Sequence, residues 1–286
     1  MSAAPHVVAV RVTERSWRSE ARAVRAVWWR ELIRFADDRA RIVMAFIQPL
    51  LFLFVLAPGL QSLSEGATDG VDLTTFMFPG VLCMAIWFSA MISAASLVMD
   101  RELGFLREMV VAPVRRSSIV LGKCLGGMST AMVQGVILLA LAGLAHVPYD
   151  PALLLGIFGL QLLIAFAVTA LGVMVATTVK QAQTFNSVMQ LLVFPTVFLS
   201  GALYPVSGLP SWLGAINRIN PLTYAVDPLR RLVFDHLDVS GAAREALAPG
   251  VTWWGWPVPS LLEAVMVLAL GVAVLAIAIF KFSRTE

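Results

Sequence analysis

Long apolar runs separated by short polar connections form the main pattern of this chain. About 20 apolar residues cross the hydrocarbon core of a bilayer as a helix. The runs that reach or approach this length are residues 42–60, 76–98, 119–144, 152–178, 185–201 and 261–281. The pattern predicts an all-α integral membrane protein with six transmembrane helices, in which Pro49 and Pro195 kink the first and fifth spans.

Basic residues gather in alternate connections between these runs. Residues 1–41 carry nine arginines, and the connection 99–118 carries four, whereas the connections 61–75 and 145–151 contain neither Lys nor Arg. Cytoplasmic loops of membrane proteins are enriched in Lys and Arg. We therefore expect a multi-pass protein of the cytoplasmic membrane: a cytoplasmic segment 1–41, then a six-span domain 42–286 with its C-terminus also inside and the long connection 202–260 outside.

The cytoplasmic N-terminal segment contains an amphipathic helical pattern. Its apolar residues recur at three- and four-residue steps: Trp17, Ala21, Val24, Trp28, Leu32 and Phe35. Arginines occupy most of the remaining circumference. This arrangement predicts an interfacial helix in the headgroup layer of the membrane lipids. Packing of the apolar face on a partner protein is the alternative.

Composition supports the membrane assignment and excludes several classes of function. The chain is 59% hydrophobic and 14% charged, with a net charge of +3, against about 25% charged residues in soluble domains. No basic run alternates with aromatics as nucleic-acid binding requires. The three histidines have no metal-ligand spacing, and neither Cys83 nor Cys124 belongs to a CxxC motif. We expect no catalytic residue, no metal and no nucleic-acid partner.

A phosphate-binding loop is also missing from the sequence. The nearest match is "SIVLGKC" at 118–124, which lacks the first glycine of a Walker A motif and has Cys124 where Ser or Thr is needed. We therefore expect no cofactor in this chain and a source of energy outside it.

The connection 99–118 interleaves charged and apolar residues before a proline ends the pattern. A short amphipathic helix follows from this spacing, and it suits docking into a groove on a cytosolic partner. Lying on the membrane surface is an equal alternative. The candidate docking residues are Arg101, Glu102, Leu103, Leu106, Arg107, Glu108 and Pro113.

The stretch after the fifth run is apolar, yet it is interrupted by proline and glycine. Non-helical backbone at membrane depth is tolerated only where protein or a water-filled cavity surrounds it. We therefore predict short re-entrant helices over 202–237 that form an outer lid over a passage. The candidate lid residues are Gly201, Tyr204, Pro205, Pro210, Pro221, Tyr224, Asp227 and Arg230.

Polar and aromatic residues share faces of the second and fifth spans. Such a mixed wall suits an amphipathic cargo, because aromatics stack and amides accept varied partners. Hydrogen bonding between helices at a dimer interface is an equal or better alternative. The candidate path residues are Trp87, Ser89, Ser93, Asn186, Gln190, Phe194 and Phe198. Gly122 and Gly126 are expected to let helices approach closely.

Two stretches resemble the type-2 ABC transporter permeases, the group that includes daunorubicin-resistance and nodulation-factor exporters. The first is "DRELGFLREMVVAPVRRSSIVLGK", and the second is "FPTVFLSGALYPVSGLPSWLGAINRINPLTYAVDPLR". The first departs from the family pattern at Phe105, where Thr is usual, and at Arg107, where Glu is usual.

The resemblance implies a permease without enzymatic activity of its own. Two copies of a separate cytosolic ATPase would bind ATP and Mg²⁺, and a second permease copy, identical or related, would face this one across a central path. The expected function is export of hydrophobic or amphipathic compounds, chiefly drugs or antibiotics. The alternative cargo is a lipid or a lipid-linked glycan. A membrane enzyme would need His, Asp or Glu within the spans, and this chain has almost none there. An ion-coupled carrier would need intramembrane carboxylates or an inverted repeat, and neither is evident.

Overall fold

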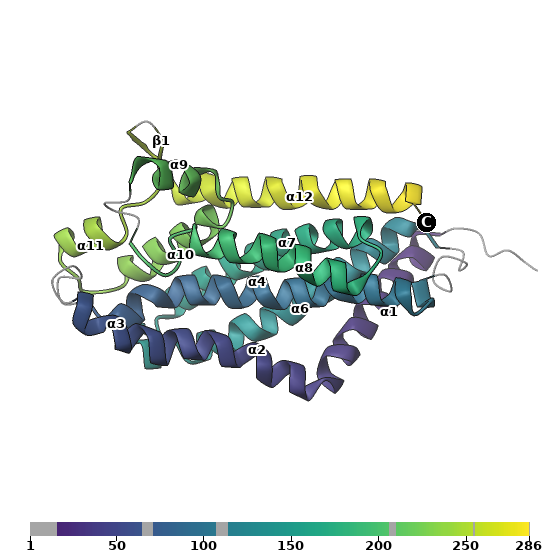
Figure 1. The fold of residues 1–286 in the computed structure, drawn as a ribbon, viewed down its shortest axis with the longest axis horizontal. Helices are drawn as coiled ribbons and strands as arrows, with labels where there is room; N and C mark the ends of the chain where they lie inside the picture. The colour runs from purple at the N-terminus through teal and green to yellow at the C-terminus, as the bar shows by residue number, and fades with distance from the viewer. Residues whose placement is uncertain (1–15, 65–70, 107–113, 206–209, 254, 286) are drawn as a thin grey trace, which may run out of the picture.

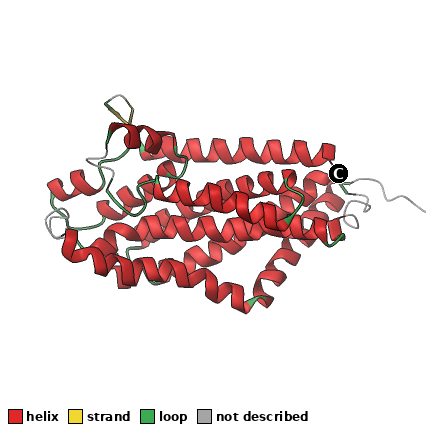
Figure 2. Ribbon diagram, viewed as in Figure 1, coloured by secondary structure: helices red, strands yellow, loops and turns green. Residues whose placement is uncertain are grey.

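The computed structural model describes residues 16–64, 71–106, 114–205, 210–253 and 255–285. They form an elongated bundle that is almost entirely helical (Figures 1 and 2). The long helices are α1 (Trp17–Asp37), α4 (Leu73–Glu102), α6 (Arg116–Ala140), α7 (Pro151–Thr178), α8 (Ala182–Phe198) and α12 (Ser260–Thr285). The all-α architecture expected from the sequence is therefore confirmed.

Five helices in the described ranges are long and apolar enough to cross a membrane. They are Ile42–Gln61, Leu73–Glu102, Arg116–Ala140, Pro151–Thr178 and Ser260–Arg284, which correspond to five of the six predicted runs. The remaining run forms α8, which has 17 residues. The structure thus supports a multi-pass membrane protein, and a sixth crossing stays a prediction.

Helix α4 is the centre of the bundle. It packs against α6, α7, α8 and α10 (Thr223–Asp235), and nearly all of its side chains are buried. An apolar surface around the whole circumference is what such a central helix requires. By contrast, α12 packs mainly on α7 and lies along one side of the bundle (Figure 1), where Leu261, Val272 and Phe280 are exposed.

The first span is a helix with an irregular middle. It consists of α2 (Arg39–Leu51), a π-helical turn at Phe52–Leu56 and α3 (Ala57–Ser64). Pro49 lies inside α2. Proline lacks the N–H that the helix interior requires and displaces the carbonyl one turn before it. The irregularity predicted at Pro49 is therefore found just after it, as a change in the hydrogen-bonding period.

Helix α1 begins at a capping box, in which Ser16 and Ser19 bond to each other's backbone. It meets α2 at a sharp corner and crosses the end of the bundle that also holds the C-terminus (Figure 1). Its main neighbour is α6. A Cβ built on Gly122 would lie 2.7 Å from Val27 Cβ, and one on Gly126 would lie 2.5 Å from Glu31 Cβ. The close approach predicted for these two glycines is confirmed, with α1 as the partner helix.

The other end of the bundle is built from short elements. These are α9 (Ser211–Ile219), α10, α11 (Gly241–Leu247) and a hairpin of β1 (Thr252–Trp253) and β2 (Trp256–Pro257). On that side, Asp72 precedes α4 and Asp150 precedes α7, and both aspartates accept backbone N–H bonds as N-caps. Helix α6 ends instead through a 3-10 turn, Ala142–Ala145, that stops at left-handed His146.

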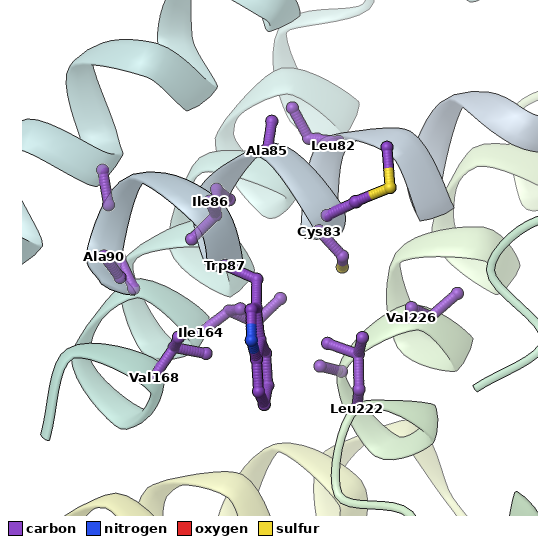
Figure 3. Packing of buried hydrophobic residues seen from close by; sticks show 14 of the residues in the cluster. Leu82, Cys83, Ala85, Ile86, Trp87, Ala90, Ile164, Val168, Leu222 and Val226 are labelled. Atoms are coloured by element: carbon purple, nitrogen blue, oxygen red, sulfur yellow. The ribbon is translucent and has the colours of Figure 1, made fainter. Parts of the chain in front are cut away.

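Trp87 marks the middle of the packed core. Figure 3 shows its indole pointing from α4 between Ile164 and Val168 of α7 on one side and Leu222 on the other. All four side chains are buried. The core therefore joins the long helices to the start of α10, so that the short elements rest on the bundle.

Candidate functional site

Five charged side chains meet where α1, α4 and α6 come together. Lys123 Nζ of α6 is 2.7 Å from Glu31 Oε1 of α1, donates to Ser96 Oγ at 3.0 Å, and forms an ion pair with Asp100 of α4. Asp100 is also paired with Arg30 and Arg34 of α1, the latter at 3.0 Å. Buried charges persist when they are paired and hydrogen-bonded. We call Glu31, Asp100 and Lys123 the charge cluster; all three are buried.

Sequence reasoning missed the charge cluster. Lys123 lies inside the predicted run 119–144, and an ionisable residue at such a position demands a partner. That position was the available signal for a buried ion pair. Glu31 was left out of the apolar stripe because it is charged, yet it faces α6 while Trp17 is 86% exposed. Glu31 therefore lies on the side of α1 that packs on α6, because of its ion pair with Lys123, and the interfacial role of the stripe stays a prediction.

The end of α4 is tied to the connection between α7 and α8. Arg101 Nη1 donates to Ala176 O at 3.1 Å and to Val179 O at 2.6 Å. Glu102 Oε1 accepts the N–H of Ala182, the first residue of α8, at 2.9 Å. A carboxylate at a helix N-terminus satisfies an otherwise unpaired N–H group. Arg101 and Glu102 thus link the predicted docking connection to α8.

The remaining docking residues occupy different environments. Helix α4 stops at Glu102, and Gly104 has a positive φ of 83° that favours glycine. The predicted amphipathic helix therefore does not continue from α4, because the chain turns at this glycine, and helical backbone resumes at Phe105 and Leu106. Leu103 is exposed, whereas Leu106 is 1% exposed and belongs to the core. Arg107, Glu108 and Pro113 lie outside the described residues.

The predicted lid is held to the bundle through Arg230 of α10. Its Nη2 donates to Gly201 O at 2.7 Å and to Ala202 O at 3.2 Å, and its guanidinium lies 4.2 Å above the Phe76 ring. The same turn presses against α4, where a Cβ on Gly80 would lie 2.0 Å from Ala202 O. The lid and α4 are therefore in direct backbone contact.

Two asparagines tie the end of α8 to the start of the lid helices. Asn217 Nδ2 donates to Leu199 O at 2.9 Å, and Asn220 Nδ2 donates to Thr196 O at 2.6 Å. Tyr204 closes the turn by donating its hydroxyl to Phe198 O at 2.6 Å. These bonds satisfy carbonyls at the C-terminal end of α8, which Pro195 and the helix end leave without partners.

Other predicted lid residues complete this network or border it. Tyr224 donates to Arg218 O at 2.6 Å and accepts from Trp253 Nε1 at 2.9 Å. Asp227 is paired with Arg231, which also approaches Glu263 Oε1 at 3.5 Å. Pro205 is half-buried after the turn, while Pro210 and Pro221 are exposed, Pro210 directly before α9 and Pro221 between α9 and α10.

The predicted path residues of α8 share one exposed face. Asn186, Gln190, Phe194 and Phe198 are all exposed. The Phe194 and Phe198 rings stack at 6.4 Å, and Phe194 meets Phe88 of α4 edge-on at 6.2 Å. This surface combines amides with aromatics along a helix of 17 residues.

The predicted path residues of α4 lie elsewhere. Trp87, Ser89 and Ser93 are buried, and Ser93 lies against Gly127 of α6. The structure therefore does not bring them together with the exposed face of α8. They occupy the packed interior, where a passage would need α4 and its neighbours to separate.

A bundle of long apolar helices, closed at one end by short helices and carrying buried charges at the other, is the architecture of a multi-span membrane protein. The model of the ABC-2 type transporter family matches residues 22–234. The chain belongs to that family, as the resemblance of its two motifs indicated. Its members are permease subunits that associate with an ABC ATPase and are not enzymes themselves, so the expectation of a non-enzymatic permease is confirmed.

Several named proteins are similar to this chain. "Putative transport permease ycf38" of Cyanophora paradoxa is 29% identical over 195 residues, covering 67% of each chain. Nodulation protein J of Rhizobium leguminosarum bv. trifolii is 26% identical over 215 residues, covering 74% of this chain and 81% of that protein. "Probable multidrug ABC transporter permease YbhR" of Escherichia coli (strain K12) is 27% identical over 165 residues, covering 57% of this chain and 44% of that protein.

Proposed function

We propose that this chain is the membrane half of an ATP-driven exporter that moves hydrophobic or amphipathic compounds out across the cytoplasmic membrane. The exposed face of α8 is the observation that carries the proposal. Asn186 and Gln190 would meet lipid in an isolated subunit, and polar side chains at membrane depth face other helices or water instead. A second permease copy opposite this face, identical or related, gives these residues a polar path between the two subunits.

The sixth crossing of the proposed topology is α8. Its 17 residues, at 1.5 Å per residue, span about 25 Å, close to the roughly 30 Å of the hydrocarbon core. The turn and lid helices that follow extend it. With six crossings both termini lie in the cytoplasm, and the lid with α11 and the hairpin lies outside, as the distribution of arginines favours.

The proposed route of coupling runs from the end of α4 to α8. Two copies of a cytosolic ATPase would bind ATP and Mg²⁺ and press on the connection that follows Glu102. Because Arg101 and Glu102 bond directly to the α7–α8 connection, a displacement there reaches the proposed path. A displacement of α8 would also reach the lid, since the hydrogen bonds from Asn217 and Asn220 hold the other end of α8.

Aromatic and amide side chains on one face favour a small amphipathic cargo, because rings bury apolar surface while amides accept varied partners. The name of the relative YbhR, which refers to multidrug transport, points the same way. A lipid or lipid-linked glycan is the competing cargo. We expect inside-out vesicles with the chain and its ATPase to accumulate a fluorescent amphipathic drug, and accumulation of a lipid-linked glycan alone would contradict this choice of cargo.

Topology has its own test, which uses the burial of both native cysteines. Because Cys83 and Cys124 are buried, an introduced cysteine is the thiol that a maleimide reaches. Ala242→Cys on α11 should react with an impermeant maleimide from outside intact cells. Ser283→Cys near the C-terminus should react only after permeabilisation. Labelling of both positions from outside would contradict the proposed orientation.

A further inference from the structure

Two hollows adjoin at the end of the bundle that carries the short helices. The first has a volume of about 210 Å³ and lies between α9, α10 and residues 249–252. The second, of about 390 Å³, is lined by Ala215, Arg218, Ile219, Tyr224 and Trp253. Arg218 lines both. We call them the polar hollow and the apolar hollow.

The polar hollow carries more positive than negative charge. Arg218, Arg230 and Asp227 line it, but Asp227 is already engaged by Arg231 and by the N–H of Val251 at 3.2 Å. The Arg218 side chain forms no ion pair or hydrogen bond with any described residue, and it is exposed. An anion would therefore meet two guanidinium groups without a competing free carboxylate.

Arg230 is the buried side of the polar hollow. Its side chain is 3% exposed, and its Nε–H has no acceptor within the described part of the chain. Burial lowers the pKa of Arg230 to about 10, so the group remains charged at neutral pH. A buried charged donor without an acceptor is unfavourable, and an oxyanion is the acceptor whose geometry matches a guanidinium.

The apolar hollow continues from Arg218 onto an aromatic surface. Ile219 is 81% exposed, and Trp212 and Trp256 are exposed beside it on α9 and β2. Tryptophan is enriched at the membrane–water interface, because its ring is amphipathic. The surface beside the charged hollow therefore suits a hydrocarbon chain.

We propose that these hollows bind one membrane phospholipid, with its phosphate between Arg218 and Arg230 and an acyl chain over Ile219 and Trp253. The lipid comes from the leaflet that faces the lid. The site goes beyond the proposed export function, because it holds for any cargo. Since Arg230 also bonds to the turn after α8, the bound phosphate and the lid share one side chain, and lid stability becomes dependent on membrane lipid.

Native mass spectrometry of the full-length chain in detergent tests this site with dioleoyl phosphatidylglycerol as the probe. Arg218→Gln should weaken the tightest lipid adduct about tenfold, the value of one lost charge-assisted hydrogen bond. Arg218→Lys should recover part of it, because the charge is kept without the planar fork. Arg218 is exposed, so both variants leave the packed lid intact, and thermal unfolding verifies this.

Arg244→Gln on α11 is the matched control, since it removes an arginine from the same end of the molecule outside both hollows, and it should leave the adduct unchanged. Equal lipid affinity in Arg218→Gln and the unmodified chain overturns the proposal. A further experiment distinguishes a phospholipid headgroup from free inorganic phosphate as the bound anion. Ile219→Asn should weaken the lipid adduct, and millimolar inorganic phosphate should not displace it. Displacement by inorganic phosphate, with no effect of Ile219→Asn, would mean a free-anion site and would also overturn the lipid assignment.

Discussion

Replacing Lys123 by Met removes the only cation that contacts Glu31 among the described residues. Met has nearly the length and volume of Lys, so the change deletes the charge and leaves the space filled. Asp100 keeps Arg30 and Arg34 as partners. Glu31, which is 4% exposed, loses the cation with which it is paired. The variant therefore isolates the effect of one unpaired buried carboxylate between α1 and α6.

Breaking a buried ion pair by removing one partner lowers the free energy of unfolding by about 3–5 kcal/mol. Replacing both partners by apolar residues of similar size is far less harmful, because no charge remains unpaired. Lys123→Met with Glu31→Leu should therefore be more stable than Lys123→Met alone by about 2 kcal/mol. Its stability should still stay below that of the unmodified chain, since Asp100 has also lost a cation.

Unfolding in mixed micelles of mild detergent and dodecyl sulfate, followed by tryptophan fluorescence, measures these differences. The control is Arg244→Gln, which breaks the exposed pair with Asp235 and should change stability by about 1 kcal/mol or less. Two results would refute the reasoning. One is a free energy of unfolding of Lys123→Met within about 0.5 kcal/mol of that of the unmodified chain. The other is a double variant that is no more stable than Lys123→Met alone.

Other substitutions test the lid contact and the link from α4 to α8. Gly80→Ala places a Cβ 2.0 Å from Ala202 O and should lower the free energy of unfolding by about 1–3 kcal/mol. The control, Gly159→Ala, has open space around its Cβ and should leave stability unchanged. Equal melting temperatures of the two variants would contradict the contact between the lid and α4. Glu102→Ala should lower transport per ATP hydrolysed, because the N–H of Ala182 loses its acceptor, while thermal stability changes by only about 1 kcal/mol. Unaltered coupling in purified vesicles would exclude Glu102 from the route.

Much of the fold was predictable because each span is a continuous apolar run. The bounds of α7 and α12 match the predicted 152–178 and 261–281 within a few residues at most. The π-helical turn after Pro49 was not predictable, because proline indicates an irregularity without fixing its form. The hairpin at Thr252–Pro257 is too short for an alternating pattern to reveal it.

The candidate site was less accessible to sequence reasoning. Arg101 and Glu102 looked like groups for an external partner, but they bond to the chain's own α7–α8 connection. Leu106 has the same apolar character as Leu103, and only the turn at Gly104 separates a buried position from an exposed one. Ion pairs between helices 70 or more residues apart, such as Arg30 with Asp100, leave no local pattern.

Transport in inside-out vesicles tests the central claim most directly. The purified chain alone should move no amphipathic dye with or without ATP, and addition of its cytosolic ABC ATPase should produce uptake that stops when hydrolysis is blocked. Dye uptake by the chain alone, driven by an ion gradient in the absence of ATP, would contradict the account.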